Sequence, residues 1–549
     1  PLQRIQLRLK LHRTHLFALI LTLVVITVYY RTVMLQPGGS RWRYANPLKI
    51  FILASSSLDD ADQAGMAAVR EMAQFAWRGY TNSCLRQHKT GNELAPLTRN
   101  CSSNSDGIVG AGNLLTVIDS LDTLAVLGLP AEFDEGRSFI RNFYNPQRTW
   151  QEVSVFETTI RLLGGLLGAY SVSEDVLFLK LAAQLGDGLA PAFPRDGGFF
   201  PRVKLFSNVT PSSNLIYTAE IGSLYLEFAY LAELTGNEKY FNWVDKLQRE
   251  LLQIRGLDGI LTKQLMLREP TLDVASGPFS IAGGTDSYYE YLVKRCMFDS
   301  DVKPDCVDTF TKVLDSIMKH LTVHVSKDDS GGVHTCIGEL SHPTDLKLCS
   351  MDHLTCFAGG MFALAYLQVP KRVDWLDYAE KITETCYLSY QHSPLNSAQR
   401  NLLTISTKFV ADIDMYILRP ETVESLFYLY RVTGKPKYRQ WGWSILKALN
   451  TSTRVGSGFS GIESMNSAYM RHDNMQWSFF LAETLKYLYL LFSPTDKLPL
   501  DLWLFNTEAH AIPTRAERNI LCRERQPNES GPASKWIKAT SGVFQSFAA

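Results

Sequence analysis

The chain has 549 residues, 46% of them hydrophobic and 20% charged, so it has enough apolar residues to bury a large core. Its 55 basic and 55 acidic side chains give a formal net charge of zero. This balance excludes a strongly basic protein and gives no electrostatic reason to expect binding to nucleic acid. Length alone allows two or more domains, although a closed barrel of this size also occurs as one unit.

The first segments predict a membrane anchor. Residues 1–15 contain four basic side chains and no acidic one, and residues 16–30 carry no charge. A helix of fifteen residues is shorter than the roughly 30 Å apolar core of a bilayer, but flanking residues extend it, so we predict a transmembrane signal anchor over residues 16–35. A cleaved signal peptide is the alternative, although no small-x-small cleavage site follows. Positive charge before the anchor predicts a single-pass type II membrane protein whose tail, residues 1–15, is cytosolic.

Glycosylation and cysteine patterns agree with a lumen of the endoplasmic reticulum or Golgi apparatus. Four N-x-S/T sequons lie at Asn100, Asn208, Asn450 and Asn528. The nine cysteines lack the C-x-x-C spacing of metal sites. In an oxidising lumen some should pair, and the odd number leaves at least one free or bonded to another chain. Residues 36–62 have the mixed composition of a stem.

Helical periodicity dominates from residue 63 to residue 513, which we predict to be one luminal domain. Residues 224–244 and 426–443 both contain an apolar helix, a Thr-Gly-x-x-Lys-Tyr turn and a second helix, and residues 163–182 have the same outline. Repeated helix pairs predict an open solenoid or a closed ring, and acidic and aromatic residues at helix starts favour the ring. Residues 514–549 are polar without clear periodicity, as in a C-terminal tail.

A strand and two polar segments interrupt the helical pattern in the first half of the chain. Residues 197–205 alternate as a hairpin arm. Glu157 and Arg161 lie four apart on an apolar helix; a semi-buried ion pair would explain them, whereas burial would raise the pKa of Glu157, as in a general acid. Asp286 follows Gly-Gly-Thr and precedes several aromatics, which suits an N-cap or a sugar platform.

Residues 351–357 contain His353 in an apolar run, where a structural histidine is more common than a ligand. Further on, Pro420 suits the first position of an apolar helix, and Glu421 and Glu424 share a face near its positive end. With Arg419, these acids fit either a capped helix with a local ion pair or the wall of a cleft.

Acidic and oxygen-bearing residues also follow in the last part of the chain. Asp473 and Glu483 lie close to or within apolar helical sequence. The oxygens of residues 505–510 (FNTEAH) would suit Ca²⁺, although the D-x-D-x-D-G pattern is absent. The chain has no G-x-S-x-G, Walker or H-E-x-x-H motif. Carboxylates near aromatics, in a lumen that handles glycoproteins, therefore favour glycoside hydrolysis by two carboxylates.

Eight runs carry a family resemblance. They are IDSLDTL (118–124), VSVFETTIRLLGGLLGAY (153–170), AEIGSLYLEF (219–228), DSYYEYL (286–292), MDHLTCF (351–357), LRPETVESLFYLYR (418–431), FFLAETLKYLYLLF (479–492) and FNTEAH (505–510). In this order they resemble the class I α-1,2-mannosidases, glycoside hydrolase family 47. The resemblance implies an all-α fold, an (αα)7 barrel of helix hairpins, with a monomeric catalytic domain. It also implies Ca²⁺-dependent, inverting removal of α-1,2-linked mannose from high-mannose N-glycans.

The same resemblance implies roles for individual residues. Glu157 would be the general acid, directly or through a water, Glu421 the general base, and Asp286 a third catalytic carboxylate. Thr507 would bind Ca²⁺ through its hydroxyl and carbonyl oxygens, with water completing the shell. The residues that match the lining of the mannose and calcium pocket are Arg161, Glu220, His353, Arg419, Glu424, Phe479, Glu483 and Glu508. Cys356 and Cys386 match the family's disulfide, and the pairing of the other cysteines stays open.

Three departures from the family pattern concern branch preference. Gly284 stands where branch-specific members carry arginine and Golgi-type members carry leucine, residues 394–398 replace a T-G-L-x-P-E segment, and Trp477 is an insertion. The alternative function is that of a mannose-binding, degradation-enhancing relative that acts as a lectin in glycoprotein quality control. Those relatives also have glycine at this position but alter the motifs of His353 and Glu483. Both motifs are intact here, which favours a hydrolase.

Overall fold

A computed structural model describes residues 61–525, apart from residues 89, 195–197, 208–214, 269–270, 276, 300–303, 327–332, 343–348, 350, 392–402, 407, 412–414 and 465–469. The predicted cytosolic tail and anchor lie outside the described residues, as do nearly all of the stem and residues 526–549. Within the described part of the chain, no helix has the length and apolar character needed to cross a membrane.

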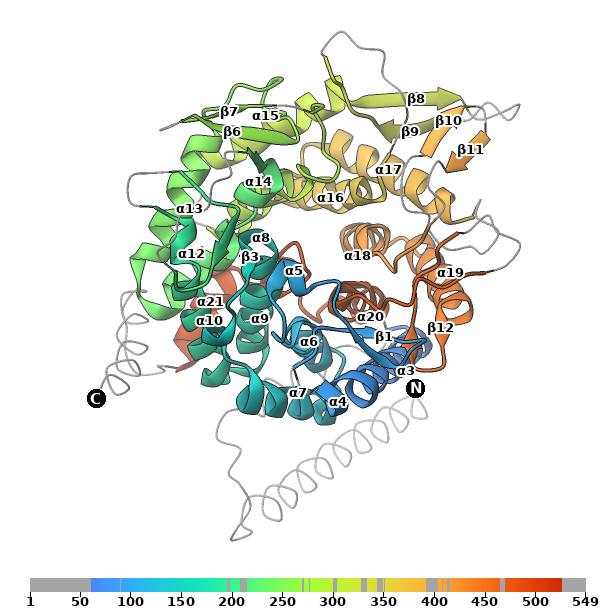
Figure 1. The fold of residues 1–549 in the computed structure, drawn as a ribbon. Coiled ribbons are helices and arrows are strands. Elements are labelled where there is room, and N and C mark those ends of the chain that lie inside the picture. The colour runs from blue at the N-terminus through green and yellow to red at the C-terminus, as the bar shows by residue number, and fades with distance from the viewer. Residues whose placement is uncertain are drawn as a thin grey trace, which may run out of the picture. The chain divides into compact units, whose positions relative to one another are not determined.

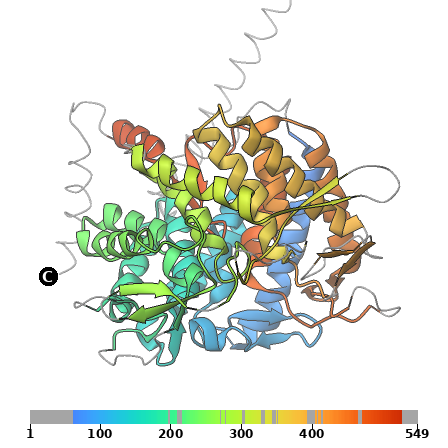
Figure 2. The same cartoon turned by 90° about the horizontal axis from the view of Figure 1, so that it is seen from above.

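Paired helices form an inner and an outer ring (Figure 1). The outer helices are α3 (Gln63–Tyr80), α7 (Pro130–Phe143), α10 (Val176–Gly188), α13 (Glu238–Leu251), α15 (Pro304–His320), α17 (Val373–Gln391) and α19 (Lys437–Ser452). The inner helices are α6 (Leu115–Val126), α9 (Gly164–Ser173), α12 (Tyr225–Thr235), α14 (Asp286–Phe298), α16 (Ala358–Gln368), α18 (Glu421–Thr433) and α20 (Leu485–Phe492). Each inner helix contacts the next, and α20 contacts α6. Figure 2 shows the same helices after a 90° turn. The predicted helical barrel is confirmed, and the open solenoid is wrong.

The two rings differ in their sequence patterns for a physical reason. Inner helices are covered on all sides, so α9 is buried along nearly its whole length, whereas α13 buries one stripe and exposes the other side. The close packing of α9 on α6 depends on small residues. A Cβ on Gly165 would lie 2.7 Å from the carbonyl oxygen of Ile118, so only glycine permits this approach.

The predicted helix hairpins are confirmed by their turns. Gly236 and Gly434, with φ of 67° and 66°, end α12 and α18 in the left-handed conformation that caps helix C-termini. Glu174, with φ of 58°, takes the same role after α9. Short turns of this kind make the two helices of each pair antiparallel neighbours.

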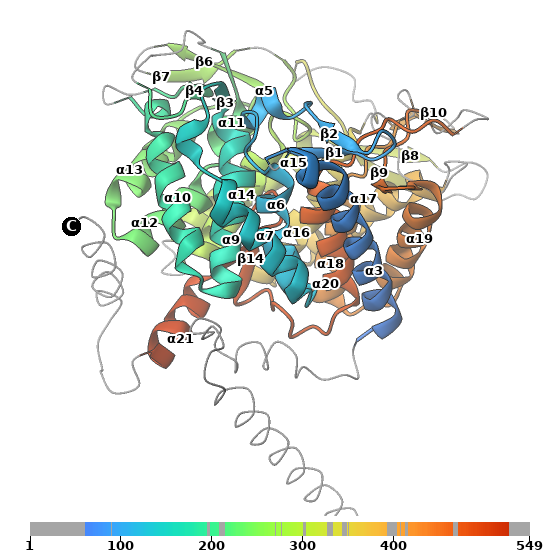
Figure 3. The same cartoon turned by 60° about the horizontal axis from the view of Figure 1, so that its bottom comes forward.

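Short antiparallel strands gather mostly at one end of the helices (Figure 3). The pairs are β1 (Glu93–Ala95) with β2 (Asn100–Ser102), β3 (Glu152–Ser154) with β4 (Arg202–Lys204), β8 (Thr322–Ser326) with β9 (Val333–Ile337), β10 (Leu403–Ser406) with β11 (Lys408–Ala411), and β12 (Arg454–Val455) with β13 (Gly458–Phe459). A three-stranded sheet contains β5 (Leu215–Tyr217), β6 (Gln264–Arg268) and β7 (Thr271–Val274). The fold is therefore mostly helical rather than all-α. The predicted strand in residues 197–205 is β4, but its partner β3 comes from much earlier in the chain.

One hairpin lies among the helices instead (Figure 3). It consists of β14 (Trp503–Phe505) and β15 (Ala511–Pro513), with Phe505 opposite Ala511. β14 contacts α14 and β15 contacts α9, both inner helices. Its loop therefore reaches the interior of the barrel, where buried side chains from several helices surround it.

Shorter helical segments connect these elements. They are α4 (Arg86–His88), α5 (Asp106–Val109), α8 (Val155–Glu157), α11 (Thr218–Gly222), the 3₁₀ segments η3 (Pro146–Arg148), η5 (Ala190–Ala192) and η6 (His353–Phe357), and the π segments η2 (Thr81–Leu85), η4 (Thr158–Leu163) and η7 (Phe480–Thr484). A last helix, α21 (Arg515–Arg525), begins in the predicted tail. Arg518 attaches it to the barrel, because its guanidinium donates to the Pro513 carbonyl at 2.7 Å and pairs with Glu233.

Four disulfides join parts of the described chain. The predicted Cys356–Cys386 bond is confirmed. The pairings that the sequence left open include Cys84–Cys101, Cys296–Cys306 and Cys336–Cys349. Disulfides in this number are typical of an oxidising compartment. The sequon residues Asn100 and Asn450 are both exposed, as glycosylation requires.

Candidate active site

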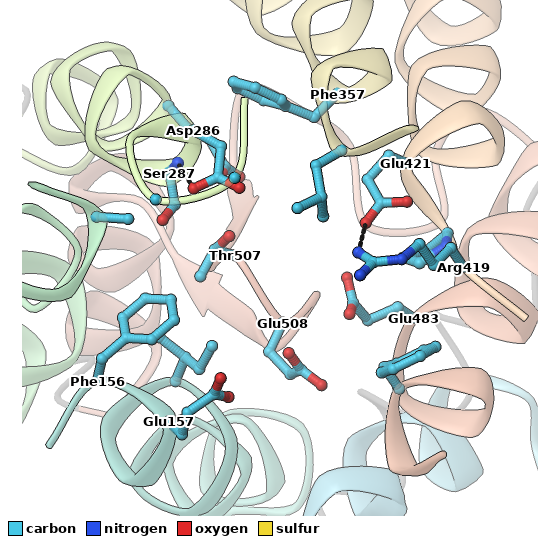
Figure 4. Close-up of a pocket in the computed structure, with 18 of the residues that line it drawn as sticks. Phe156, Glu157, Asp286, Ser287, Phe357, Arg419, Glu421, Glu483, Thr507 and Glu508 are labelled. Atoms are coloured by element: carbon cyan, nitrogen blue, oxygen red, sulfur yellow. Dashed lines mark hydrogen bonds and ion pairs between the residues drawn. The ribbon is translucent and has the colours of Figure 1, made fainter. Parts of the chain in front are cut away.

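A cavity of about 490 Å³ lies among the starts of the inner helices and the tip of the β14–β15 hairpin. It is lined by Phe156, Glu157, Ile160, Arg161, Tyr217, Ala219, Glu220, Gly283, Gly284, Asp286, Ser287, Glu290, Leu354, Phe357, Arg419, Pro420, Glu421, Glu424, Phe479, Glu483, Thr507 and Glu508. Every residue that the sequence assigned to catalysis, sugar binding or calcium is in this set except His353. Figure 4 shows Glu157 and Glu421 on opposite sides, with Thr507 and Glu508 between them.

Helix starts bring the carboxylates together. Asp286 is the first residue of α14 and Glu421 the first of α18, while Glu157 ends α8 just before η4. The positive end of a helix dipole favours a carboxylate at such positions. The observed caps are Thr285 and Pro420. Helix α14 therefore begins one residue earlier than an N-cap at Asp286 would give, and α18 begins one residue later than predicted.

Glu421 has two polar partners that hold its carboxylate. His353 Nδ1 lies 2.7 Å from Glu421 Oε2, and Arg419 Nη1 donates to Oε1 at 3.2 Å. Tyr390 Oη lies 3.0 Å from His353 Nε2, so the imidazole is fixed on both sides. Burial by itself raises the pKa of Glu421, but the neighbouring His353 and Arg419 outweigh it and lower the pKa to about 2. Glu421 is therefore a carboxylate near neutral pH.

The turn before Glu421 has a strained backbone. Leu418 has φ of 69°, a left-handed conformation that is uncommon for a leucine. Its carbonyl accepts a hydrogen bond of 2.7 Å from the hydroxyl of Thr484, in η7. This bond ties the turn that carries Arg419 to the segment that carries Glu483. Backbone strain of this kind is maintained by surrounding structure and is common at functional sites.

Asp286 differs from Glu421 in its hydrogen-bond partners and in its pKa. Its carboxylate accepts a hydrogen bond of 2.9 Å from the backbone of Ser287. Burial is the main cause that raises the pKa of Asp286 to about 7; the hydrogen bond from Ser287 opposes it, and the nearby acids Asp352, Glu290 and Glu421 add to it. A substantial fraction of Asp286 therefore carries a proton near neutral pH.

Glu157 belongs to an ion-pair network. Its Oε2 lies 2.7 Å from Nε of Arg161, which also binds Glu508 and lies 5.8 Å from the ring centre of Phe479. The side chain of Glu157 is 26% exposed. Of the two alternatives for Glu157, the structure shows the ion pair with Arg161 four residues along the helix, and not a carboxylate isolated among apolar groups. Arg161 and Glu483 both lie in π segments, a distortion that is frequent at functional sites.

Acidic side chains outnumber basic ones in the cavity, since eight Asp and Glu residues and two arginines line it. Burial raises the pKa of Glu424, Glu483 and Glu508 well above the usual range, and neighbouring carboxylates add to the effect. Such a cavity suits hydroxyl groups that donate hydrogen bonds, and it suits a cation. Within the described residues, no group of three or more His, Cys, Asp or Glu side chains is arranged to ligate a metal directly.

The loop that carries Thr507 is held by Asn506. The Asn506 amide donates to Glu227 Oε1 at 2.7 Å, and its Oδ1 accepts from the backbone nitrogens of Glu508 and His510 at 3.0 and 2.8 Å. These hydrogen bonds pair the buried polar groups of the loop, and Thr507 lies at the cavity surface. Glu227 lies outside the cavity, and burial raises its pKa to about 7.

A buried network of two acids and two bases supports the same loop. His510 Nε2 lies 3.0 Å from Asp119 Oδ1, and His510 Nδ1 lies 3.2 Å from Asp122 Oδ1. Lys486 Nζ lies 2.9 Å from Asp122 Oδ2 and donates to the carbonyl of Ala509 at 2.6 Å. Burial raises the pKa of Asp122, but Lys486 and His510 lower it to about 2. The network explains why the IDSLDTL run carries two aspartates.

Replacing Lys486 with methionine is expected to lower the free energy of unfolding by about 3–5 kcal/mol, because Asp122 loses its main counter-charge while it stays buried. Urea denaturation of the variant and the parent measures the effect. The matched control is Lys381→Met, which breaks an exposed lysine–aspartate pair with Asp377 and should change stability little. Equal stability of the two variants would contradict this role of Lys486.

Sequence reasoning missed some cavity residues and overestimated one. Glu290 lines the cavity and pairs with Lys294. Its spacing of four from Asp286 on the same helix was the signal that pointed to it. Tyr217 had no such signal, because strand pairing brings it to the site. Asp473 is outside the cavity lining, and its carboxylate accepts a hydrogen bond of 2.9 Å from the backbone of Met475.

Comparison with known proteins agrees with this geometry. Residues 72–514 match glycosyl hydrolase family 47, and these residues include all of the cavity lining. The chain belongs to glycosyl hydrolase family 47. The family predicted from the eight sequence runs is thus confirmed.

Curated family-47 relatives are enzymes. Human mannosyl-oligosaccharide 1,2-alpha-mannosidase IB is 38% identical over 464 residues, which cover 81% of this chain and 69% of that protein. The human IC enzyme is 38% identical over 473 residues, covering 81% and 70%. Among solved structures, the alpha-1,2-mannosidase from Trichoderma reesei matches with a TM-score of 0.75 and 27% identity, over 83% of this chain and all of that one. This family-47 chain is therefore a glycosidase.

Proposed function

We propose that this family-47 glycosidase removes α-1,2-linked mannose from high-mannose N-glycans, with inversion and with bound Ca²⁺, in N-glycan processing. The main support is that Glu157, Asp286 and Glu421 line one cavity, with the predicted acid and base on opposite sides (Figure 4). The names of the relatives supply the substrate class. The lectin alternative is less well supported, because the motifs of His353 and Glu483, which the lectin-like relatives alter, are intact here: His353 is bonded to Glu421, and Glu483 lines the cavity.

Glu421 is proposed to accept a proton from the attacking water. His353 and Arg419 keep the carboxylate ionised and fix its orientation. A carboxylate with a pKa of about 2 is a weak base, so the water it activates must be unusually acidic. Inversion requires room for this water between the base and the sugar, and therefore an acid on the other side of the sugar.

The residues around Thr507 fit a hard cation. Its hydroxyl and carbonyl oxygens would hold Ca²⁺, and water would complete the shell and donate to the carboxylates of Glu424, Glu483 and Glu508. This arrangement agrees with a carboxylate-rich cavity in which no cluster of acidic side chains among the described residues ligates a metal directly. When bound, the cation lowers the pKa of nearby water, which complements the weak base.

The proton for the leaving oxygen is proposed to come from Glu157, directly or through a water. Asp286, part of which burial keeps protonated near pH 7, is the third proposed catalytic carboxylate. In the full step, the bond between the anomeric carbon and the leaving oxygen breaks and the bond to water oxygen forms. Glu421 receives a proton from that water, and the leaving oxygen receives one from the opposite side.

We further propose that the barrel lies in the lumen of the endoplasmic reticulum or Golgi apparatus as a monomeric domain behind the predicted signal anchor. Four disulfides and the exposed sequon residues Asn100 and Asn450 support a luminal location. The positive charge before residues 16–35 supports a cytosolic N-terminus.

Incubating the full chain with a nine-mannose N-glycan and Ca²⁺ is expected to release free mannose, first as the β anomer because an α bond is hydrolysed with inversion. Mass spectrometry of the glycan and proton NMR of the released sugar measure both outcomes. A lectin would bind the glycan and leave all nine mannoses in place. Release of the α anomer first would contradict inversion.

A further inference from the structure

Tyr217 is the most exposed side chain of the cavity lining. It ends β5, and 46% of it is exposed, whereas Phe479 in the same lining is 9% exposed. The other lining residues are buried or partly buried. Tyr217 therefore lies at the mouth of the cavity, where its ring borders both the interior and the solvent.

The backbone holds Tyr217 firmly although its ring is exposed. Its nitrogen donates to Glu220 Oε2 at 3.0 Å, and it pairs with Gln264 across the β5–β6 ladder. The next residue, Thr218, donates to the carbonyl of Lys263 at 3.1 Å. The ring is thus placed by ordered backbone on both sides, and little conformational freedom is lost when a ligand covers it.

Gly284 leaves room for the ring. Its φ of 97° is a conformation that residues with a Cβ rarely adopt, and a Cβ there would lie 3.0 Å from Cδ1 of Tyr217. The Gly284 carbonyl also accepts a hydrogen bond of 2.8 Å from Ala219, which fastens the two segments together. The space beside the Gly284 backbone is therefore occupied by an aromatic ring from another part of the chain.

We propose that the Tyr217 ring is a platform for a mannose residue that stays outside the cavity, and that it contributes to the choice of branch. The inference rests on the proposed function. A cavity of about 490 Å³ encloses only the end of a branched nine-mannose glycan, so the rest must cross the mouth. The apolar C–H face of a sugar packs well on an exposed aromatic face, which loses water-accessible apolar surface in the contact.

The test compares two substrates in Tyr217→Ala. For the nine-mannose glycan, KM is expected to rise on the order of five- to tenfold, with kcat unchanged, because uniform binding is lost. For the disaccharide mannosyl-α-1,2-mannose, which lacks the outer sugars, both constants should remain those of the parent. The ratio of the first eight-mannose isomers should also change. Tyr217→Phe keeps the ring and should restore the parent values.

Leu215→Ala is the matched control, because Leu215 lies on the same face of β5 at 42% exposure but is not in the cavity lining. It should leave both substrates unaffected. Equal losses on the two substrates, or no loss on either, would overturn the platform. If the parent chain releases no mannose at all, the proposed function fails. Calorimetric binding of the nine-mannose glycan to Glu421→Gln, with and without Tyr217→Ala, then still decides the role of the ring.

Discussion

Replacing Glu421 with glutamine is expected to slow mannose release on the order of 10²–10⁴-fold while the nine-mannose glycan still binds. Glutamine preserves the size of the side chain but does not accept a proton from water. The loss should appear in kcat, because a base acts in the transition state and contributes little to ground-state binding. Turnover of the glycan gives the rate, and isothermal titration calorimetry gives the affinity.

The control for this variant is Glu380→Gln, in the outer helix α17. Glu380 pairs with Lys435 and is absent from the cavity lining, so its replacement should leave kcat unchanged. The pKa of Glu421 is lowered to about 2, so the base is already ionised throughout the neutral range. Near-parental turnover in Glu421→Gln would therefore exclude this carboxylate as the base.

Removing calcium is expected to abolish turnover and to lower the melting temperature by roughly 3 °C, relative to protein held at about 100 times the calcium dissociation constant. A cation that binds only the folded state stabilises it by mass action. Removal also leaves the excess of buried carboxylates in the cavity without a counter-charge. Scanning calorimetry and glycan turnover, with chelator and then with added Ca²⁺, measure the two effects.

Variants of Thr507 separate the specific site from general effects of a chelator. Thr507→Ser keeps the hydroxyl and should respond to calcium like the parent. Thr507→Val removes the hydroxyl at similar volume and should show a smaller calcium-dependent shift in melting temperature. If the chelator changes neither melting temperature nor turnover in the parent chain, the calcium assignment is wrong.

Short sequence patterns predicted the helix hairpins and the acidic cleft of this protein. The Thr-Gly-x-x-Lys-Tyr turns predicted the helix hairpins, because a left-handed Gly236 or Gly434 ends a helix whatever surrounds it. Carboxylates placed where apolar helices begin predicted a cleft, because acids at such positions need partners. The family resemblance implied that Glu157, Asp286 and Glu421 belong to one site, and in the structure these three residues line one cavity.

Contacts between distant segments determined the features that the sequence did not predict. Closure of the ring by α20 on α6, the pairing of β4 with β3, and the position of Tyr217 beside Gly284 join residues far apart in the chain. No local pattern specifies such pairs. Contacts between distant segments also set the pKa values of the site acids. Glu421 and Asp286 are each the first residue of a helix, so their local position cannot explain why their pKa values differ. His353 and Arg419 lower the pKa of Glu421, whereas burial beside other acids raises that of Asp286.

The sequence by itself determined the helical hairpins, the chemistry of the site residues and the family, because these depend on residue type and short spacing. Only the tertiary structure decided which carboxylates have a lowered pKa, which have a raised pKa, and which aromatic ring borders the mouth of the cavity. The physical reason is that pKa and exposure depend on what surrounds a side chain in space, and the neighbours of these residues come from other helices and strands.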